Sequence, residues 1–420
     1  MNRKREKILI VSLTFFILLS LCLKSSPILV GDGPEYFLML EAFFRHHSPD
    51  IRLDDVARQQ ELKLISSELL EQISNCIKNQ CSVGPGNNIV HSPKGEYFSI
   101  HFWFYPLIAT PIKTILFLFK INELKSFQIV NALLITAAVA YVVQISKKLS
   151  SSTICAIFWF VSISLLYLPW PNPEVYSASL LFMACFAFLE GKLMACSITT
   201  ALSSLQNPSV ILFLPIAITA EYIDARNKDR SLDDLYRKKY RYLLGLVIGL
   251  AIASIPYLFY FYYFQTGNLI VKMGFIDYGL INLDRLFSVF FDLNQGLIVG
   301  YPGIVLGIFL LILLKLRRLF LSKEDYKNNY KSYFLCLGTL IILIPTLAQV
   351  NGNGGQELFS RYAFWGGIPL IVFVSNQLES LRPKVKYILI GLISLLQLLA
   401  ISFNDYHYLH MKTYSEFMIE

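Results

Sequence analysis

Two carboxylates stand close together early in the chain, in the sequence Gly31-Asp32-Gly33-Pro34-Glu35-Tyr36. The glycines and the proline predict a turn that leads into a helix. A carboxylate positioned by such a turn can accept a proton from a hydroxyl or bind a divalent cation. The simpler alternative is that Asp32 and Glu35 only cap the helix that follows.

A second polar cluster runs from His91 to His101 and contains Lys94 and Glu96. Imidazole, ammonium and carboxylate groups in one short stretch suit a phosphate or a sugar as the ligand. The aromatic residues that follow, Phe102–Tyr105, are ordinary anchors at a membrane surface. A purely structural role is the alternative for His101.

Polar residues mark three later points in the chain as candidate substrate-binding sites. Glu174 follows a proline-rich stretch and leads into an apolar segment, where capping of a helix is the alternative role. Asn207 precedes Pro208 at a predicted helix break, and Gln295 precedes Gly296 before another apolar segment.

A glycine-rich stretch at 351–357 leads to Arg361 and Tyr362 at the start of an apolar segment. Exposed backbone N–H groups and a guanidinium both match phosphate oxygens, so this stretch predicts a phosphate-binding loop. The Lys-Ser/Thr pair and the strand-to-helix setting of a nucleotide-binding P-loop are absent. The alternative for Arg361 is a side chain that only reaches toward the membrane surface.

The composition predicts an integral membrane protein that must position these residues with helices. Of 420 residues, 55% are hydrophobic and 16% charged, and the mean hydropathy is +0.52, whereas a soluble domain carries about 25% charged residues. Apolar runs that approach the ~20 residues needed to cross a bilayer recur along the chain. This excludes a secreted disulfide scaffold, a nucleic-acid-binding protein and a disordered chain. We expect an all-α polytopic protein with one membrane domain, residues 1–404.

The distribution of Lys and Arg predicts the topology. The basic segment Met1–Lys7 precedes a first span at 8–30, which lacks a signal-peptide cleavage site and is expected to be retained. The polar loop 31–100 then lies outside, in the periplasm, whereas 221–242 and 315–331 are basic and lie in the cytoplasm. The further apolar segments are 101–119, 127–145, 153–169, 175–190, 193–206, 208–220, 243–264, 297–314, 332–349, 362–379 and 385–403.

An inside N-terminus and a periplasmic tail at 405–420 require an odd number of crossings. Because twelve apolar segments are present, we expect about eleven transmembrane helices, with 101–119 re-entrant or broken at its prolines. Within the polar loop, Glu35–His47 and Asp55–Lys78 are predicted to be helices on the membrane surface. Ordinary loop helices are the alternative.

Cys76 and Cys81 lie in the predicted periplasmic loop, where an oxidising compartment favours a disulfide between them. Two free thiols are the alternative. The other five cysteines lie in apolar segments and are expected to be core residues.

The candidate polar sites all fall at the outer ends of predicted spans. Ionisable groups at such positions are costly in lipid, so they are functional candidates by default. No hydrolase triad, metalloprotease or dinucleotide-binding pattern occurs in a supporting context. The residues alone indicate a site at the outer membrane boundary for polar, phosphate-bearing, lipid-linked material.

The order and shared sidedness of these motifs resemble the GT-C superfamily of polytopic glycosyltransferases, which use polyprenyl-phosphate sugars. Each motif alone is unspecific, but together they extend over most of the chain. The matching motifs are Gly31–Tyr36, Gly95–His101 with the prolines after it, Glu174, Asn207-Pro208, Gly296-Leu297 with Pro302, and Gly354-Gly355 with Arg361-Tyr362 and Pro369.

The resemblance implies transfer of a sugar, such as a hexose, from undecaprenyl phosphate to a hydroxyl of a cell-surface glycan. Lipid-linked O-antigen is an acceptor of this kind, and the reaction would take place on the periplasmic face of a bacterial inner membrane. Asp32 would be the general base, and Arg361, helped by Lys94 or His101, would bind the leaving phosphate.

The resemblance also implies that Glu35 and Glu174 orient hydroxyl groups of the acceptor or the sugar. Some members of the superfamily use a divalent metal, Mg²⁺ or Mn²⁺, which would bind here at Asp32 and Glu35. Asn207 stands where many relatives carry Arg, which argues against a phosphate-binding role at that position.

Two other classes of membrane protein handle the same lipid carriers. A transporter or flippase would show inverted repeats and polar breaks at mid-membrane, and no such repeat is visible in the sequence. An O-antigen ligase or polymerase also has a large outer loop. The acidic motif directly after the first span favours transfer from a monosaccharide carrier instead.

Overall fold

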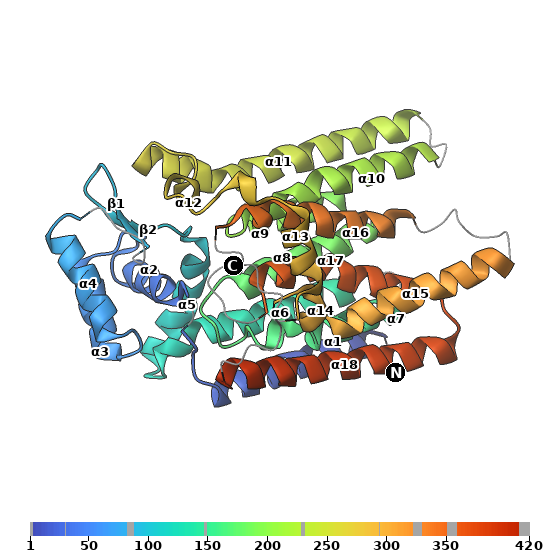
Figure 1. The fold of residues 1–420 in the computed structure, drawn as a ribbon, viewed down its shortest axis with the longest axis horizontal. Helices are drawn as coiled ribbons and strands as arrows, with labels where there is room; N and C mark the ends of the chain where they lie inside the picture. Colours follow the sequence, from blue (N-terminus) through green and yellow to red (C-terminus); the bar gives the residue numbers. More distant parts are fainter. Residues whose placement is uncertain are drawn as a thin grey trace.

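The computed structural model describes residues 3–29, 31–81, 88–146, 149–227, 232–293, 295–321, 330–350 and 359–410. The predicted phosphate-binding loop at 351–357 and the last part of the tail lie outside the described residues. The described chain is almost entirely helical, as predicted, with two short strands. Figure 1 shows a bundle of long helices with a smaller lobe at one end.

We call residues 31–118 the end lobe, because they gather at that end of the bundle (Figure 1). The short strands pair antiparallel as a hairpin, with Val90 opposite Phe98. Helix α2 packs against both α3 and α5. The elements of the lobe are α2 (Gly33–His46), α3 (Leu53–Leu62), α4 (Ser67–Lys78), β1 (Ile89–His91), β2 (Tyr97–Ser99) and α5 (Phe104–Leu118).

The remaining helices form the bundle. They are α1 (Arg3–Lys24), η1 (Glu123–Lys125), α6 (Ser126–Ile145), α7 (Leu149–Phe160), η2 (Ile163–Leu165), α8 (Glu174–Leu189), α9 (Leu193–Ser204), η3 (Pro208–Leu212), α10 (Phe213–Asn227), α11 (Leu232–Phe264), α12 (Leu269–Lys272), η4 (Tyr278–Leu280), α13 (Leu283–Phe291), α14 (Leu297–Gly300), α15 (Pro302–Leu321), α16 (Tyr330–Leu343), η5 (Ile344–Ala348), α17 (Arg361–Leu378) and α18 (Pro383–His410).

The bundle has an enclosed centre and an apolar outside. Helices α8 and α17 are buried along nearly their whole length, which suits helices that are apolar on every face. Helices α1, α11 and α18 instead expose large apolar side chains, such as Phe16, Leu258 and Leu395. Exposed apolar faces of this extent are expected where lipid covers the protein.

Among the described residues, five helical segments are long and apolar enough to cross a membrane: α1, η1 with α6, α11, α16 with η5, and α18. Other apolar helices, among them α5, α7, α8 and α9, are shorter. The structure therefore supports a membrane protein, and the number of about eleven crossings stays a prediction.

The helix predicted over Asp55–Lys78 is in fact two helices, α3 and α4. Lys63 ends α3 in the left-handed conformation, with φ of 54°, so the helix cannot continue through it. Ser66 then starts α4 by accepting the backbone N–H of Leu69 on its hydroxyl. Apolar residues recur at helical spacing in both α3 and α4, so the sequence pattern gave no sign of the break between them.

Segment 101–119 is not broken at its prolines: residues Phe104–Leu118 form one continuous helix, α5, with Pro111 inside it. Pro106 lies in the first turn, where its missing N–H is tolerated, and the hydroxyl of Thr110 donates to its carbonyl at 3.0 Å. With 15 residues, α5 is about 22 Å long, shorter than the ~30 Å hydrocarbon core. It lies in the end lobe beside α2 (Figure 1).

The ends of the helices that flank the basic segments gather at the end of the bundle opposite the end lobe (Figure 1). Helix α1 begins there, α10 and α15 end there, and α18 begins there. The described helix ends that flank the basic segments therefore lie opposite the end lobe.

Candidate active site

Asp32 lies in the turn between α1 and α2. Gly31 adopts a φ of +52°, a left-handed conformation that glycine tolerates best. Gly33 packs so closely on Pro171 that an added Cβ would lie 2.9 Å from its Cγ. Asp32 occupies the N-cap position of α2 without a capping hydrogen bond from its side chain. The capping alternative is therefore wrong for Asp32, whose carboxylate makes other contacts.

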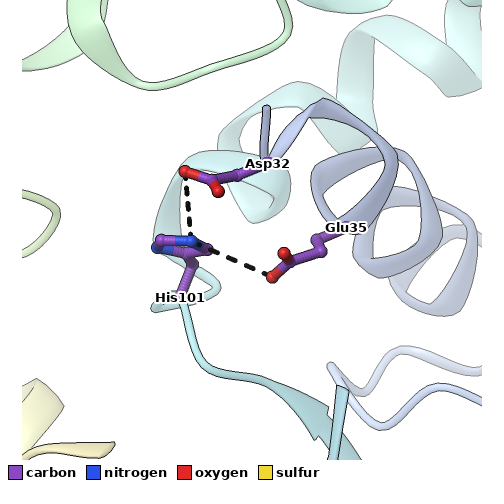
Figure 2. Close-up of side chains that lie close together, drawn as sticks. All are labelled: Asp32, Glu35 and His101. Atoms are coloured by element: carbon purple, nitrogen blue, oxygen red, sulfur yellow. Dashed lines mark ion pairs between the residues drawn. The ribbon is translucent and has the colours of Figure 1, made fainter. Parts of the chain in front are cut away.

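His101 reaches this turn from the loop after the β1–β2 hairpin. Ser99 donates its hydroxyl to Glu35 Oε2 and accepts the backbone N–H of His101 at 2.9 Å. His101 Nε2 lies 3.1 Å from Asp32 Oδ2 and 4.0 Å from Glu35 Oε2 (Figure 2). Its ring also stacks on Tyr36, with 5.7 Å between the ring centroids. The hairpin thus places the imidazole between the two carboxylates.

Arg361 joins the same turn from a position 329 residues further along the chain. It is the first residue of α17, which Ser360 caps by accepting the backbone N–H of Tyr362. Arg361 Nη1 donates to Asp32 Oδ2 at 2.9 Å and lies 3.6 Å from Glu174 Oε1. Glu174 begins α8, and its side chain is only 1% exposed.

We call Asp32, Glu35, His101, Glu174 and Arg361 the acid–histidine cluster. Its members come from the first turns of α2, α8 and α17 and from the hairpin loop. Three helix N-termini, with their positive partial charges, therefore point toward one place, which favours binding of an anion. Asp32, His101 and Arg361 keep 16%, 14% and 17% of their side chains exposed, so these three side chains are partly accessible to solvent.

Burial and mutual charge set the protonation of the cluster. Burial alone would raise the pKa of Asp32, but the positive charges of His101 and Arg361 hold it well below its usual range. Burial raises the pKa of Glu35 to about 7. Burial would lower the pKa of His101, but the carboxylates of Asp32 and Glu35 raise it to about 9. Asp32 is therefore ionised at neutral pH, and His101 carries a proton unless a metal ion replaces it.

Three buried polar atoms of the cluster make no hydrogen bond to any described residue. They are Glu174 Oε2, Arg361 Nε and His101 Nε2, whose contact with Asp32 is an ion pair. Each buried polar atom left without a partner costs about 1–3 kcal/mol. A ligand with oxygen atoms for Arg361 and a hydroxyl for Glu174 would satisfy two of them.

The donor atoms of Asp32, Glu35 and His101 fit a divalent metal ion. One atom from each residue lies within 4.8 Å of the other two, and His101 Nε2 is unpaired by hydrogen bonding among the described residues. An imidazole together with two carboxylates suits Mn²⁺ better than Mg²⁺, which prefers oxygen ligands and bound water. The third ligand, His101, was not part of the metal site predicted from the acidic motif.

Three of the remaining predicted binding residues, Lys94, Glu96 and Asn207, make no contact with the cluster among the described interactions. Lys94 Nζ lies over the ring of Tyr262, 2.9 Å from its centroid, and Glu96 accepts a hydrogen bond from Ser92 at 2.6 Å. Both side chains belong to the hairpin turn. Asn207 Nδ2 donates to Ser177 Oγ at 2.5 Å, which joins η3 to α8.

Two other predicted binding residues, Gln295 and Tyr362, make contacts at the start of α17, next to Arg361. The carbonyl of Gln295 accepts the backbone N–H of Ser360 at 3.1 Å, which anchors the start of α17. The ring of Tyr362 lies 5.5 Å from the Arg361 guanidinium carbon. Tyr362 itself is buried.

Sequence reasoning missed two residues that hold the cluster together. Ser99 links Glu35 to the backbone of His101, and Tyr36 stacks on the imidazole. Tyr36 directly follows Glu35 and was within the acidic motif. No sequence feature marked Ser99 as part of the site, because a serine in a short strand is common.

The predicted disulfide between Cys76 and Cys81 is not formed in the structure. Both residues are free thiols, and Cys76 Sγ donates to the carbonyl of Cys81 at 3.5 Å. Gln80 adopts a φ of 51° and turns the chain sharply after α4. The turn brings the two residues together, but through this backbone contact rather than through a sulfur–sulfur bond.

The cluster combines an ionised carboxylate, a cationic guanidinium with an unused N–H and a set of metal-binding atoms. These groups can accept a proton from a hydroxyl and stabilise a leaving phosphate. Comparisons with family models, with curated proteins and with solved structures found no match to this chain.

Proposed function

We propose that the protein is a membrane glycosyltransferase that moves a hexose from a polyprenyl phosphate to a hydroxyl of a cell-surface glycan. One observation carries the proposal: Arg361 contacts both Asp32 and Glu174 where three helix N-termini meet. Glu174 Oε2 and Arg361 Nε are buried there without a hydrogen bond to any described residue. A phosphate-linked sugar supplies the anion and the hydroxyls that these groups lack.

In this reaction the acceptor oxygen attacks the anomeric carbon of the sugar. The bond between that carbon and the phosphate oxygen breaks, and the polyprenyl phosphate leaves with the bonding electrons. Arg361 neutralises the charge that develops on the leaving phosphate. Because phosphate oxygens compete with Asp32 for Arg361 Nη1, donor binding frees the Asp32 carboxylate to accept the proton of the acceptor hydroxyl.

Glu174 and Glu35 are suited to different positions around the reacting carbon. Glu174 Oε2 is buried and unpaired among the described residues, so it can accept a hydrogen bond from a hydroxyl of the sugar. Glu35, together with Asp32 and His101, can hold a divalent metal ion. When bound, such an ion would supply a positive charge that polarises the phosphate or the acceptor hydroxyl.

The distribution of Lys and Arg predicts which side of the membrane the cluster faces. The helix ends that flank the basic segments lie opposite the end lobe, which carries Asp32, Glu35 and His101, and cytoplasmic ends carry more Lys and Arg. The cluster then faces the periplasm of a bacterium, where lipid-linked O-antigen and related glycans are acceptors. The donor is a polyprenyl-phosphate sugar presented from the outer leaflet.

The test uses the purified protein in lipid nanodiscs with a polyprenyl-phosphate hexose and a lipid-linked glycan acceptor. Wild-type protein is expected to release polyprenyl phosphate and lengthen the glycan. Asp32→Asn is expected to lower the rate at least about 100-fold, because the base is lost, while Asp54→Asn, an exposed carboxylate in α3, keeps it.

Two outcomes would contradict the proposal. Wild-type rates from Asp32→Asn would remove the assigned base. Movement of the labelled lipid across the bilayer without any release of polyprenyl phosphate would make the protein a flippase instead. Mass analysis of surface glycans from cells with and without the protein then identifies the sugar.

A further inference from the structure

The peptide groups on both sides of His101 are held by side chains from the bundle. Tyr260 in α11 donates its hydroxyl to the carbonyl of Ile100 at 2.8 Å. Gln206, directly after α9, donates Nε2 to the carbonyl of Phe102 at 2.9 Å. Both bonds connect residues more than a hundred positions apart, so neither is a local turn contact.

These bonds lie within a second, smaller hydrophobic cluster between the hairpin loop and the bundle. Phe98, Ile100, Phe102 and Tyr260 are all buried in it. The ring of Phe102 meets the ring of Tyr260 edge-on, with centroids 6.3 Å apart. In this buried setting a carbonyl without its donor is costly, so the two hydrogen bonds strongly restrict the backbone at residues 100–102.

The acids of the cluster have a different support. Asp32 and Glu35 lie at the start of α2, whereas the carbonyls on both sides of His101 are held by Tyr260 of α11 and by Gln206, shortly after α9. The distance between the imidazole and the carboxylates therefore depends on where these bundle residues hold the loop, in addition to the link that Ser99 makes to Glu35. Neither Tyr260 nor Gln206 makes a hydrogen bond to a side chain of the cluster among the described residues.

We propose that Tyr260 and Gln206 are positioning residues that set His101 Nε2 against Asp32 and Glu35. The inference rests on the proposed function of the cluster. It gives Gln206, which lies just before the helix break at Pro208, a positioning role in the site. Reacting groups tolerate displacements of only about 0.5 Å, and an error of about 1 Å can cost 100-fold in rate.

The test is a double-mutant cycle on the full-length protein in nanodiscs. Tyr260→Phe is expected to lower kcat about 10- to 100-fold with little change in the KM of the lipid donor, because it misplaces the imidazole without touching the substrate. In a His101→Gln background, Tyr260→Phe should cause no further loss. Gln206→Met is expected to behave in the same way.

Tyr257→Phe is the matched control. Tyr257 lies one turn earlier on α11, is 42% exposed and makes no hydrogen bond through its hydroxyl within the described part of the chain. It should keep the wild-type kcat. If Tyr260→Phe also keeps the wild-type kcat, or if its loss multiplies with that of His101→Gln, the positioning role is wrong.

A second readout separates this inference from the proposed function. If the wild-type protein transfers no sugar, the proposed function fails, and the same cycle is then measured by the melting temperature of the purified protein. Coupling predicts that His101→Gln lowers the melting temperature less in the Tyr260→Phe background than in the wild type. Additive decreases would overturn the inference.

Discussion

Asp32 Oδ2 is shared between two cationic partners, Arg361 Nη1 and His101 Nε2. If Arg361 turns to another anion, Asp32 Oδ2 keeps its ion pair with His101. Arg361 also has an unused Nε–H among the described contacts. An incoming anion can therefore replace Asp32 as the partner of Arg361, as a site that binds and releases a phosphate requires.

Replacing Arg361 tests that exchange directly. Arg361→Lys keeps the charge but loses the planar fork and the unused Nε–H, so we expect kcat/KM for the lipid donor to fall about 10- to 100-fold. Steady-state kinetics at varied donor concentration measure the change. Arg52→Lys, at an arginine that is 56% exposed in the end lobe, is the control and should be neutral. Unchanged donor kinetics in Arg361→Lys would move the phosphate site elsewhere.

Metal binding is predicted for Asp32, Glu35 and His101. Mn²⁺ is expected to bind the purified protein more tightly than Mg²⁺, since imidazole is a ligand. His101→Gln and Glu35→Gln should each weaken Mn²⁺ binding at least about tenfold. Electron paramagnetic resonance of free Mn²⁺ gives the affinity, and Glu68→Gln, an exposed carboxylate of α4, serves as the control. Equal Mn²⁺ affinity in all these proteins would exclude this metal site.

At the scale of elements, a buried ion network joins the parts of the end lobe. Lys113 in α5 lies 2.5 Å from Glu41 in α2 and 3.2 Å from Glu123 in η1. Arg58 in α3 extends the network to Glu123 at 2.6 Å. Helix α2 is thereby linked to its neighbours through the nearly buried charges of Glu41, Lys113 and Glu123. Arg58, at the edge of the network, is 31% exposed.

Removing one member of this network should destabilise the lobe. Lys113→Met leaves Glu41 buried without its cation, and we expect a loss of about 3–5 kcal/mol in the free energy of unfolding. The double variant Lys113→Met with Glu41→Gln should recover much of that loss, because no unpaired charge remains. Thermal unfolding in detergent compares the three proteins. A double variant less stable than the single one would show that the pair itself provides the stability.

At the scale of the whole molecule, the proposed topology requires the end lobe and the N-terminus of α1 to lie on opposite sides of the membrane. Cys81 is exposed in the lobe, and Arg5 is exposed at the far end of α1. After mild reduction, a membrane-impermeant maleimide should label Cys81 in intact cells. In a Cys81→Ser background, Arg5→Cys should be labelled only after permeabilisation. Labelling of Arg5→Cys in intact cells would show that the predicted orientation in the membrane is wrong.

The amino-acid sequence determined the class of the protein and much of its helix content. Long apolar runs and a low content of charged residues indicate a membrane environment. Both properties are sums over single residues, so they can be read without knowing how the helices pack. The turn at Gly31 and Pro34 and the start of a helix at Glu174 were also readable, because they depend on local backbone preferences. The left-handed Lys63 that divides α3 from α4 was not, because lysine has no preference for that conformation.

Only the tertiary structure decided which polar motifs meet. Asp32 and Arg361 are 329 residues apart, and their contact depends on how α2, α8 and α17 pack, which no local pattern encodes. The same packing turned Lys94 toward Tyr262 and Asn207 toward Ser177, although their sequence motifs were as suggestive as those of the cluster. It also brought Tyr260 to the backbone beside His101. Residue type and spacing limit what chemistry a side chain can perform, whereas its partners are set by long-range packing.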